Sequence, residues 1–283
     1  MIRLVVNAEE FGRSPTRNRA ILEAHASGVV TSTALAGNFS DAGAPSLLAQ
    51  APRLGVGLAL ALVEGTPVAP PEEIATLLTP VGELRGRAGQ FAFHWLKGSV
   101  LPEHVEREFE AQIARARAAG LPLDHLCTRG HLGFLPGVGQ IVERVARRHS
   151  IPGIRTWVEP PTLASVTDPG RGIETSILSG LAWLMRRRLG ALRHGPRTWG
   201  YLESGRLDEV RILEILGRMG PGAHEIVCHP SEAHGGGEPE RAAGAAGSAA
   251  GDGRDELRAL TSTKIRNAID RRGIVLCRWR DLF

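Results

Sequence analysis

Short runs of apolar residues alternate along the chain with longer stretches in which apolar residues recur every three or four positions. The apolar runs are typical of buried parallel strands, and they predict strands near residues 2–7, 29–35, 54–62, 125–128, 153–157, 224–228 and 273–277. The amphipathic stretches predict helices over residues 18–26, 41–51, 103–119, 138–148, 206–219 and 255–272, with a more apolar helix around 177–189. Ser14 and Pro15 are typical of the N-cap and the first turn of the first of these helices. Strand followed by helix, repeated to the end of the sequence, is typical of an α/β fold.

Two stretches interrupt this alternation. Residues 66–101 are rich in proline and glycine, and we expect them to form a long irregular excursion over one mouth of the sheet. Residues 235–253 are mostly glycine and alanine, which predicts a flexible surface insertion far from any site. We expect a single domain over residues 1–283. No glycine-rich dinucleotide-binding turn follows the first strand, which favours a closed or partly closed barrel over an open sheet.

The composition narrows the class of protein. Lys and Arg outnumber Asp and Glu by only 34 to 30 in 283 residues, and they form no long run, so nucleic-acid binding is disfavoured. The three cysteines lack a CxxC spacing, and no apolar stretch reaches the length of a membrane span. Together with the absence of a signal peptide, these features predict a cytoplasmic protein without a membrane span.

Charged side chains stand where the predicted strands end. Because the carboxyl ends of parallel strands carry the chemistry of α/β proteins, we expect these side chains to meet at one mouth of the barrel. Adjacent residues of an extended chain point to opposite faces, so Glu9 and Glu10 serve different tasks. Solvated acids in a strand-to-helix loop are the alternative that spacing alone leaves open. The set at or near the strand ends comprises Glu9, Glu10, Glu64, Arg129, Arg155 and His229.

The run Val6-Asn7-Ala8-Glu9-Glu10-Phe11-Gly12 resembles the VNADDFG signature of the YdjC/ChbG family of carbohydrate deacetylases. Further segments resemble motifs of this family in the same order along nearly the whole chain, namely Thr31–Thr33, Gly57–Gly65, Leu123–His131, Ile154-Arg155 and Val227–Pro230. Residues 62–68 and Glu159-Pro160-Pro161 look closest to its hopanoid-biosynthesis-associated branch. The resemblance implies a distorted, TIM-like (β/α) barrel of the NodB/YdjC deacetylase type.

The chemistry that the resemblance implies is hydrolysis of an N-acetyl group on a sugar, assisted by a divalent cation. In the family, the second acid of the signature and two histidines hold the cation. The first acid, here Glu9, is implied as the general base, and the histidine of the late CHP motif, here His229, as the general acid. The implied partner is an N-acylated, sugar-like small molecule, and a homodimer is left open.

This sequence departs from the family pattern at the metal positions. Ala59 stands where the family has its first metal histidine, Arg129 stands where it has the second, and Glu10 lengthens the remaining acid. One carboxylate does not make a tight metal site, so we expect no cofactor, with Glu10, Ala59 and Arg129 as vestigial positions. A rescued site is the alternative, with replacement ligands drawn from His125, Cys127 and His131.

The expected catalytic residues are Glu9, His229 and Arg129, whose guanidinium would take over the electrostatic role of the cation. The expected substrate-binding residues are Glu10, Glu64, Arg155, His131, His94 and Trp95. Two functions stay open. The first is a hydrolase of the deacetylase type that uses metal-independent acid/base chemistry on a repurposed sugar-like or acyl-amide substrate. The second is a catalytically silent member that binds a glycan or a partner protein, with Arg129 merely neutralising two acids.

Overall fold

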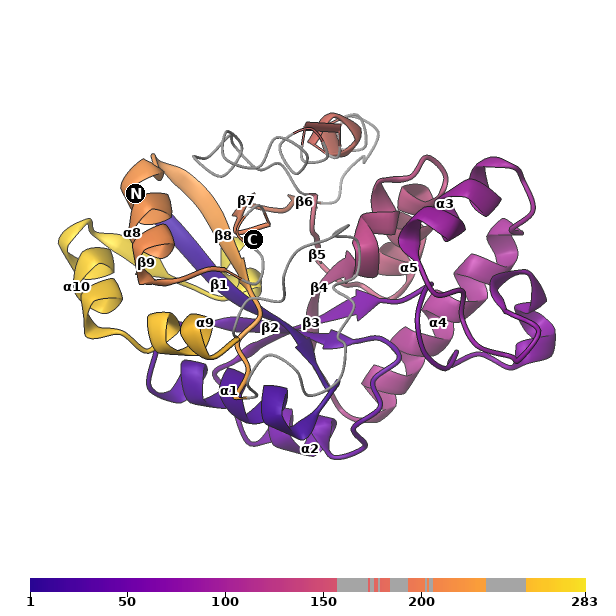
Figure 1. Ribbon diagram of the computed structural model, residues 1–283, viewed down its shortest axis with the longest axis horizontal. Helices are drawn as coiled ribbons and strands as arrows, with labels where there is room; N and C mark the ends of the chain where they lie inside the picture. The colour runs from indigo at the N-terminus through magenta and orange to yellow at the C-terminus, as the bar shows by residue number, and fades with distance from the viewer. Residues whose placement is uncertain are drawn as a thin grey trace.

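The computed structural model describes residues 1–156, 173, 176–177, 179–183, 193–201, 203, 206–232 and 253–283. Within these residues, nine strands pair in one parallel sheet with helices packed around it (Figure 1). The strands are β1 (Ile2–Phe11), β2 (Ser32–Ala36), β3 (Gly55–Leu60), β4 (Leu123–Thr128), β5 (Gly153–Ile154), β6 (Arg193–His194), β7 (Arg197–Trp199), β8 (Gly222–Cys228) and β9 (Ile274–Leu276). Their order is β6-β5-β4-β3-β2-β1-β8-β7, and β9 pairs with the start of β1.

The two ends of this strand order are joined by the chain itself. Only Gly195 and Pro196 separate β6 from β7, so the sheet curls until its first and last strands are neighbours (Figure 1). The joint requires glycine, because a Cβ at position 195 would lie 2.7 Å from the Trp279 ring and 3.0 Å from the Ile154 carbonyl oxygen. The α/β, barrel-like fold predicted from the sequence is thereby confirmed.

Residues along each strand alternate between the barrel interior and the outer face that the helices cover. On the outer face, Leu58 of β3 and Leu126 of β4 are fully buried in the main apolar core. The interior is polar instead, since Asn7 of β1 and Glu225 of β8 are also fully buried there and hydrogen-bonded to each other. The barrel interior therefore contains buried charged side chains, and the stability of the barrel depends on how these charges are paired.

The predicted helices are present. α1 (Pro15–Ala26) and α5 (Val138–Arg148) have their predicted bounds, and the ends of the others are shifted by a few residues, as α2 (Ala44–Ala49), α4 (Pro102–Ala118) and α8 (Glu209–Arg218). Helix α1 begins at the predicted cap, because Ser14 Oγ accepts a hydrogen bond from the Arg17 N–H at 3.3 Å and Pro15 occupies the first turn. In the described part of the chain, no helix is both long and apolar enough to span a bilayer.

The prediction that residues 66–101 are irregular is wrong in part. They contain α3 (Ala88–Leu96) and two short 3-10 helices, η1 (Pro71–Glu73) and η2 (Ala75–Leu77). Phe91 and Trp95 lie one helical turn apart in α3, with their rings stacked at 6.1 Å. The helix is hard to recognise from the sequence, because it has nine residues and Phe91 is the one side chain that it buries fully.

The single helix predicted over residues 255–272 is also wrong, because two helices replace it: α9 (Gly253–Leu260) and α10 (Thr263–Arg271). Thr261 Oγ1 donates back to the Leu257 carbonyl at 2.9 Å, and Ser262 Oγ accepts from the Lys264 N–H at 3.2 Å, which ends one helix and caps the next. The insertion expected over 235–253 lies outside the described residues, apart from Gly253. Of the helix expected around 177–189, residues 177 and 179–183 are described and helical.

Candidate active site

Strand β1 carries both of its acids to the mouth of the barrel. It extends to Phe11, so Glu9 and Glu10 belong to the strand itself. Glu10 has a φ of 68°, a left-handed conformation that residues other than glycine rarely adopt, and Glu64 after β3 has a φ of 62°. This turn sends the two neighbouring carboxylates to different partners. Backbone strain of this kind is concentrated at functional sites in proteins.

Glu9 belongs to a group of charges that we call the Glu9 cluster, formed by Glu9, Arg155, Glu225 and His229. Arg155 Nη1 donates to Glu9 Oε1, and His229 Nε2 lies 3.5 Å from Glu9 Oε2. Cys127 of β4 reaches the same carboxylate, with Sγ 4.0 Å from Oε1. The ends of β1, β5 and β8 therefore bring Glu9, Arg155 and His229 together, as their positions after the predicted strands indicated.

Glu9 and His229 hold each other in opposite charge states. Burial alone would raise the pKa of Glu9, but the charges of Arg155 and His229 hold that pKa well below its usual value. Burial alone would lower the pKa of His229, but its contact with Glu9 raises the pKa overall. Burial also raises the pKa of the Cys127 thiol to about 12, so this side chain is neutral beside the pair. The pair thus joins a carboxylate to an imidazole that is readily protonated.

A second group, the Arg129 cluster, consists of Arg129, Glu10, Glu64, Arg13 and Arg17. Arg129 donates from Nη1 to Glu10 at 3.2 Å, and from Nη2 and Nε to Glu64 Oε2 at 2.6 and 3.2 Å. Arg17 lies 3.5 Å from Glu10, and Arg13 lies 3.6 Å from Glu64. Burial would raise the pKa of Glu10, but Arg17 and Arg129 lower it to about 2. The protein's own carboxylates therefore occupy all three nitrogens of the Arg129 guanidinium.

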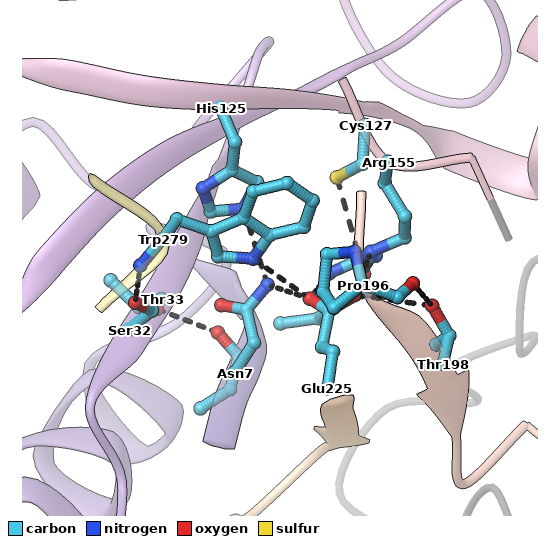
Figure 2. Close-up of polar contacts among 12 residues, drawn as sticks. Asn7, Ser32, Thr33, His125, Cys127, Arg155, Pro196, Thr198, Glu225 and Trp279 are labelled. Atoms are coloured by element: carbon cyan, nitrogen blue, oxygen red, sulfur yellow. Dashed lines mark hydrogen bonds and ion pairs between the residues drawn. The ribbon is translucent and has the colours of Figure 1, made fainter. Parts of the chain in front are cut away.

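Below the mouth lies a residue that the sequence analysis missed, the buried carboxylate of Glu225 (Figure 2). It accepts hydrogen bonds from Asn7 Nδ2 at 2.9 Å, Trp279 Nε1 at 3.0 Å and Thr198 Oγ1 at 3.3 Å. Arg155 donates to it from Nε at 3.0 Å and from Nη2 at 2.7 Å. Its position in the sequence could have indicated it, because residues 225 and 229 are four apart in an extended strand and so point to the same side as each other.

His125, weighed as a replacement ligand, points into the interior and is engaged there. Its Nδ1 lies 2.8 Å from Asp124 Oδ1, its Nε2 lies 3.2 Å from Asn7 Nδ2, and its ring stacks on Trp279 at 4.5 Å (Figure 2). His131 stacks on Phe134 at 5.9 Å, and burial lowers its pKa to about 4. Both imidazoles therefore lie in packed surroundings.

The two excursion residues expected to bind substrate, His94 and Trp95, have protein partners. His94 Nδ1 lies 3.1 Å from Ser99 Oγ, and Trp95 Nε1 donates to the Pro136 carbonyl at 2.8 Å. His94 also lines a hollow of about 430 Å³ with residues of the Arg85–Gln90 stretch. No contact joins either residue directly to Glu9 or Glu10 among the described residues.

The donor set does not suit a divalent cation. Ala59, which pairs with Cys127 between β3 and β4, offers no donor atom. Both oxygens of Glu10 face guanidinium groups, so a metal ion there would have to displace Arg17 and Arg129. Across the described ranges, no group of three or more His, Cys, Asp and Glu side chains has an arrangement that could hold a metal.

The curled parallel sheet with acids at its strand ends defines the class of α/β-barrel enzymes. The chain belongs to the YdjC-like protein family, whose model matches residues 3–271. Three similar relatives are named carbohydrate deacetylase. The Brevibacillus brevis protein is 39% identical over 56% of this chain and 60% of its own length. The mouse and human proteins are each 30% identical over 99% of this chain, which corresponds to 95% and 91% of their lengths.

The fold also has a solved relative. The crystal structure of an Enterococcus faecalis protein named for cellobiose-phosphate cleavage superposes with a TM-score of 0.73. The superposition covers 99% of this chain and 98% of that one, at 22% sequence identity. At this identity the likeness supports the barrel architecture alone.

Proposed function

We propose that this protein is a hydrolase of the carbohydrate deacetylase type that removes an acyl group from the nitrogen of a sugar-like small molecule. The relatives named carbohydrate deacetylase support the reaction class. In this proposal, Glu9 accepts the proton of an attacking water molecule, and His229 donates a proton to the departing amine. The polar mouth between the Glu9 cluster and the Arg129 cluster would hold the sugar.

One observation carries the proposal: His229 Nε2 lies 3.5 Å from Glu9 Oε2 at the end of the central strand. A base has to be ionised and an acid has to be protonated at the start of such a reaction. The lowered pKa of Glu9 and the raised pKa of His229 both favour those forms. The low pKa weakens Glu9 as a base, so the proposal predicts modest turnover.

We further propose that the reaction needs no metal ion. Arg129 occupies the position that the resemblance gives to a metal histidine, and its positive charge lies beside Glu10 and Glu64. A guanidinium stabilises negative charge but does not make hydroxide from water. Water activation therefore falls to Glu9, and Arg129 serves to hold the mouth together electrostatically.

The test is acetate release from a panel of N-acetylated sugars by protein pretreated with a chelator. Glu9→Gln and His229→Ala are expected to lower kcat/KM by roughly a hundredfold or more. Glu103→Gln is the matched control, because Glu103 lies on the exposed start of α4. Full activity in both site variants would contradict the assignment, and activity that returns only with added metal would contradict the metal-free proposal.

A silent, ligand-binding member is the second candidate, and the Arg129 cluster is the observation that favours it. Each of the three guanidinium nitrogens of Arg129 already donates to Glu10 or Glu64, so only the second N–H of Nη1 and of Nη2 is left for a substrate. This candidate predicts that calorimetry detects binding of an acetylated sugar while no acetate is released. Release of acetate that depends on Glu9 would exclude it.

A further inference from the structure

Glu225 is a fully buried carboxylate that accepts hydrogen bonds from four side chains. Its Oε1 accepts from Asn7, Trp279 and Arg155, and its Oε2 accepts from Thr198 and Arg155. These donors come from β1, β7, the chain after β5 and the C-terminal 3-10 helix η4 (Trp279–Leu282). Four separate parts of the chain thus fix one side chain (Figure 2).

Arg155 connects this buried carboxylate to the mouth. Its Nε and Nη2 form the edge that pairs with Glu225, at 3.0 and 2.7 Å. The remaining nitrogen, Nη1, donates to Glu9. A planar guanidinium has a fixed fork of donors, so the edge bound to Glu225 determines which donor is left for Glu9.

We propose that Glu225 and Trp279 are positioning residues: they hold Arg155 so that only one edge nitrogen reaches Glu9, which leaves the other oxygen of Glu9 for His229. The inference rests on the proposed role of the Glu9 and His229 pair. Without Glu225, the Arg155 fork is free to turn and to bind both oxygens of Glu9. The carboxylate would then be shared between more donors, and its attraction for His229 would weaken.

The sign of the effect follows from the charges around His229. Glu9 and Glu10 face it from β1, the Glu256 carboxylate of α9 accepts its backbone N–H at 2.6 Å, and Arg17 of α1 donates to its carbonyl at 3.4 Å. The contact with Glu9 is the main attraction that raises the His229 pKa against burial. When Arg155 binds both oxygens of Glu9, the contact between Glu9 and His229 weakens, so the pKa of His229 falls.

The readout is the titration midpoint of the His229 imidazole, followed by NMR with labelled histidine and assigned with His229→Gln. Glu225→Gln is expected to lower this midpoint, and to lower kcat/KM on the best acetylated sugar by about tenfold or more. Glu225→Asp restores the negative charge and is expected to recover much of the midpoint. Glu108→Gln is the matched control, because Glu108 is also a fully buried carboxylate but lies outside the site. It accepts hydrogen bonds from Gln112 and from the backbone of Val68 and Ala69.

Trp279→Phe tests the same inference if Glu225→Gln does not fold. Phenylalanine keeps an aromatic ring against His125 and removes the N–H that donates to Glu225. Glu225 is then less firmly fixed and holds the Arg155 fork less firmly, so the His229 midpoint is expected to fall, as in Glu225→Gln. A midpoint unchanged in all folded variants overturns the inference, whether or not acetate is released. Absence of turnover in the wild type, with the midpoints moving as stated, overturns the proposed function alone.

Discussion

Two imidazoles near the mouth respond to their surroundings in opposite ways. The His229 pKa is raised by Glu9, whereas burial lowers the His131 pKa from 6.5 to about 4. A raised folded-state pKa contributes stability that is present below the unfolded value and is lost as the pH rises through the folded value. A lowered histidine pKa contributes stability that grows as the pH rises from the folded value towards the unfolded one.

The melting temperature is therefore expected to rise from pH 4 to about 6.5, and to fall above that. Below pH 4, the melting temperature is expected to fall further, because the stability that comes from the low pKa of Glu10, about 2, is lost as its carboxylate is protonated. Differential scanning calorimetry across this pH range is the measurement. His229→Gln should flatten the alkaline fall, and His131→Phe should flatten the rise from pH 4. A maximum that stays unchanged in both variants would contradict these assignments.

At this scale, the sequence predicted most of the polar residues at the mouth but not how they pair. Strand-end positions indicated Glu9, Glu10, Glu64, Arg129 and His229, because parallel strands deliver their carboxyl ends to one edge. The pairing of Arg155 with Glu225 could not be predicted, since Glu225 lies within a strand and 70 residues further along the chain. Pairings of that kind are set by tertiary packing.

Helices and strands were predictable where one face is strongly apolar, and the errors have local causes. Helix α5 coincides with its predicted span, 138–148, because six of its residues are buried. Helix α3 was missed because its one fully buried side chain gives little periodicity. The break between α9 and α10 depends on the hydroxyl groups of Thr261 and Ser262, which compete with the helix for backbone partners.

Helix α3 also gives a prediction at the scale of one element. Trp95→Phe removes the hydrogen bond to the Pro136 carbonyl and keeps an aromatic ring against Phe91. The expected result is a loss of about 1 kcal/mol of unfolding free energy with KM and kcat within twofold of the wild type. Urea denaturation and steady-state kinetics are the measurements. A KM that rises severalfold without loss of stability would instead assign Trp95 to substrate binding.

For the molecule as a whole, the charges of the mouth predict how the protein responds to metal. Because Arg17 and Arg129 already neutralise Glu10, removal of divalent ions by a chelator should leave the melting temperature unchanged. The double variant A59H/R129H frees Glu10 from one guanidinium and adds two imidazoles. Zinc is expected to raise the melting temperature of that variant and not that of the wild type. Stoichiometric metal in the purified wild-type protein would contradict the prediction.

The position of β1 has a consequence for the order in which the chain folds. β1 is the first strand in the sequence, yet it pairs with β8 along Ile2–Ala8 and with β9 along Ile2–Leu4. On a ribosome, its partner β2 emerges early, whereas β8 and β9 are synthesised much later. Contacts so distant in sequence are costly to form. Glu9 therefore meets its partner His229 only after β8 has been made. The barrel closes late, and the charges of the Glu9 cluster are brought into their pairs only in that step.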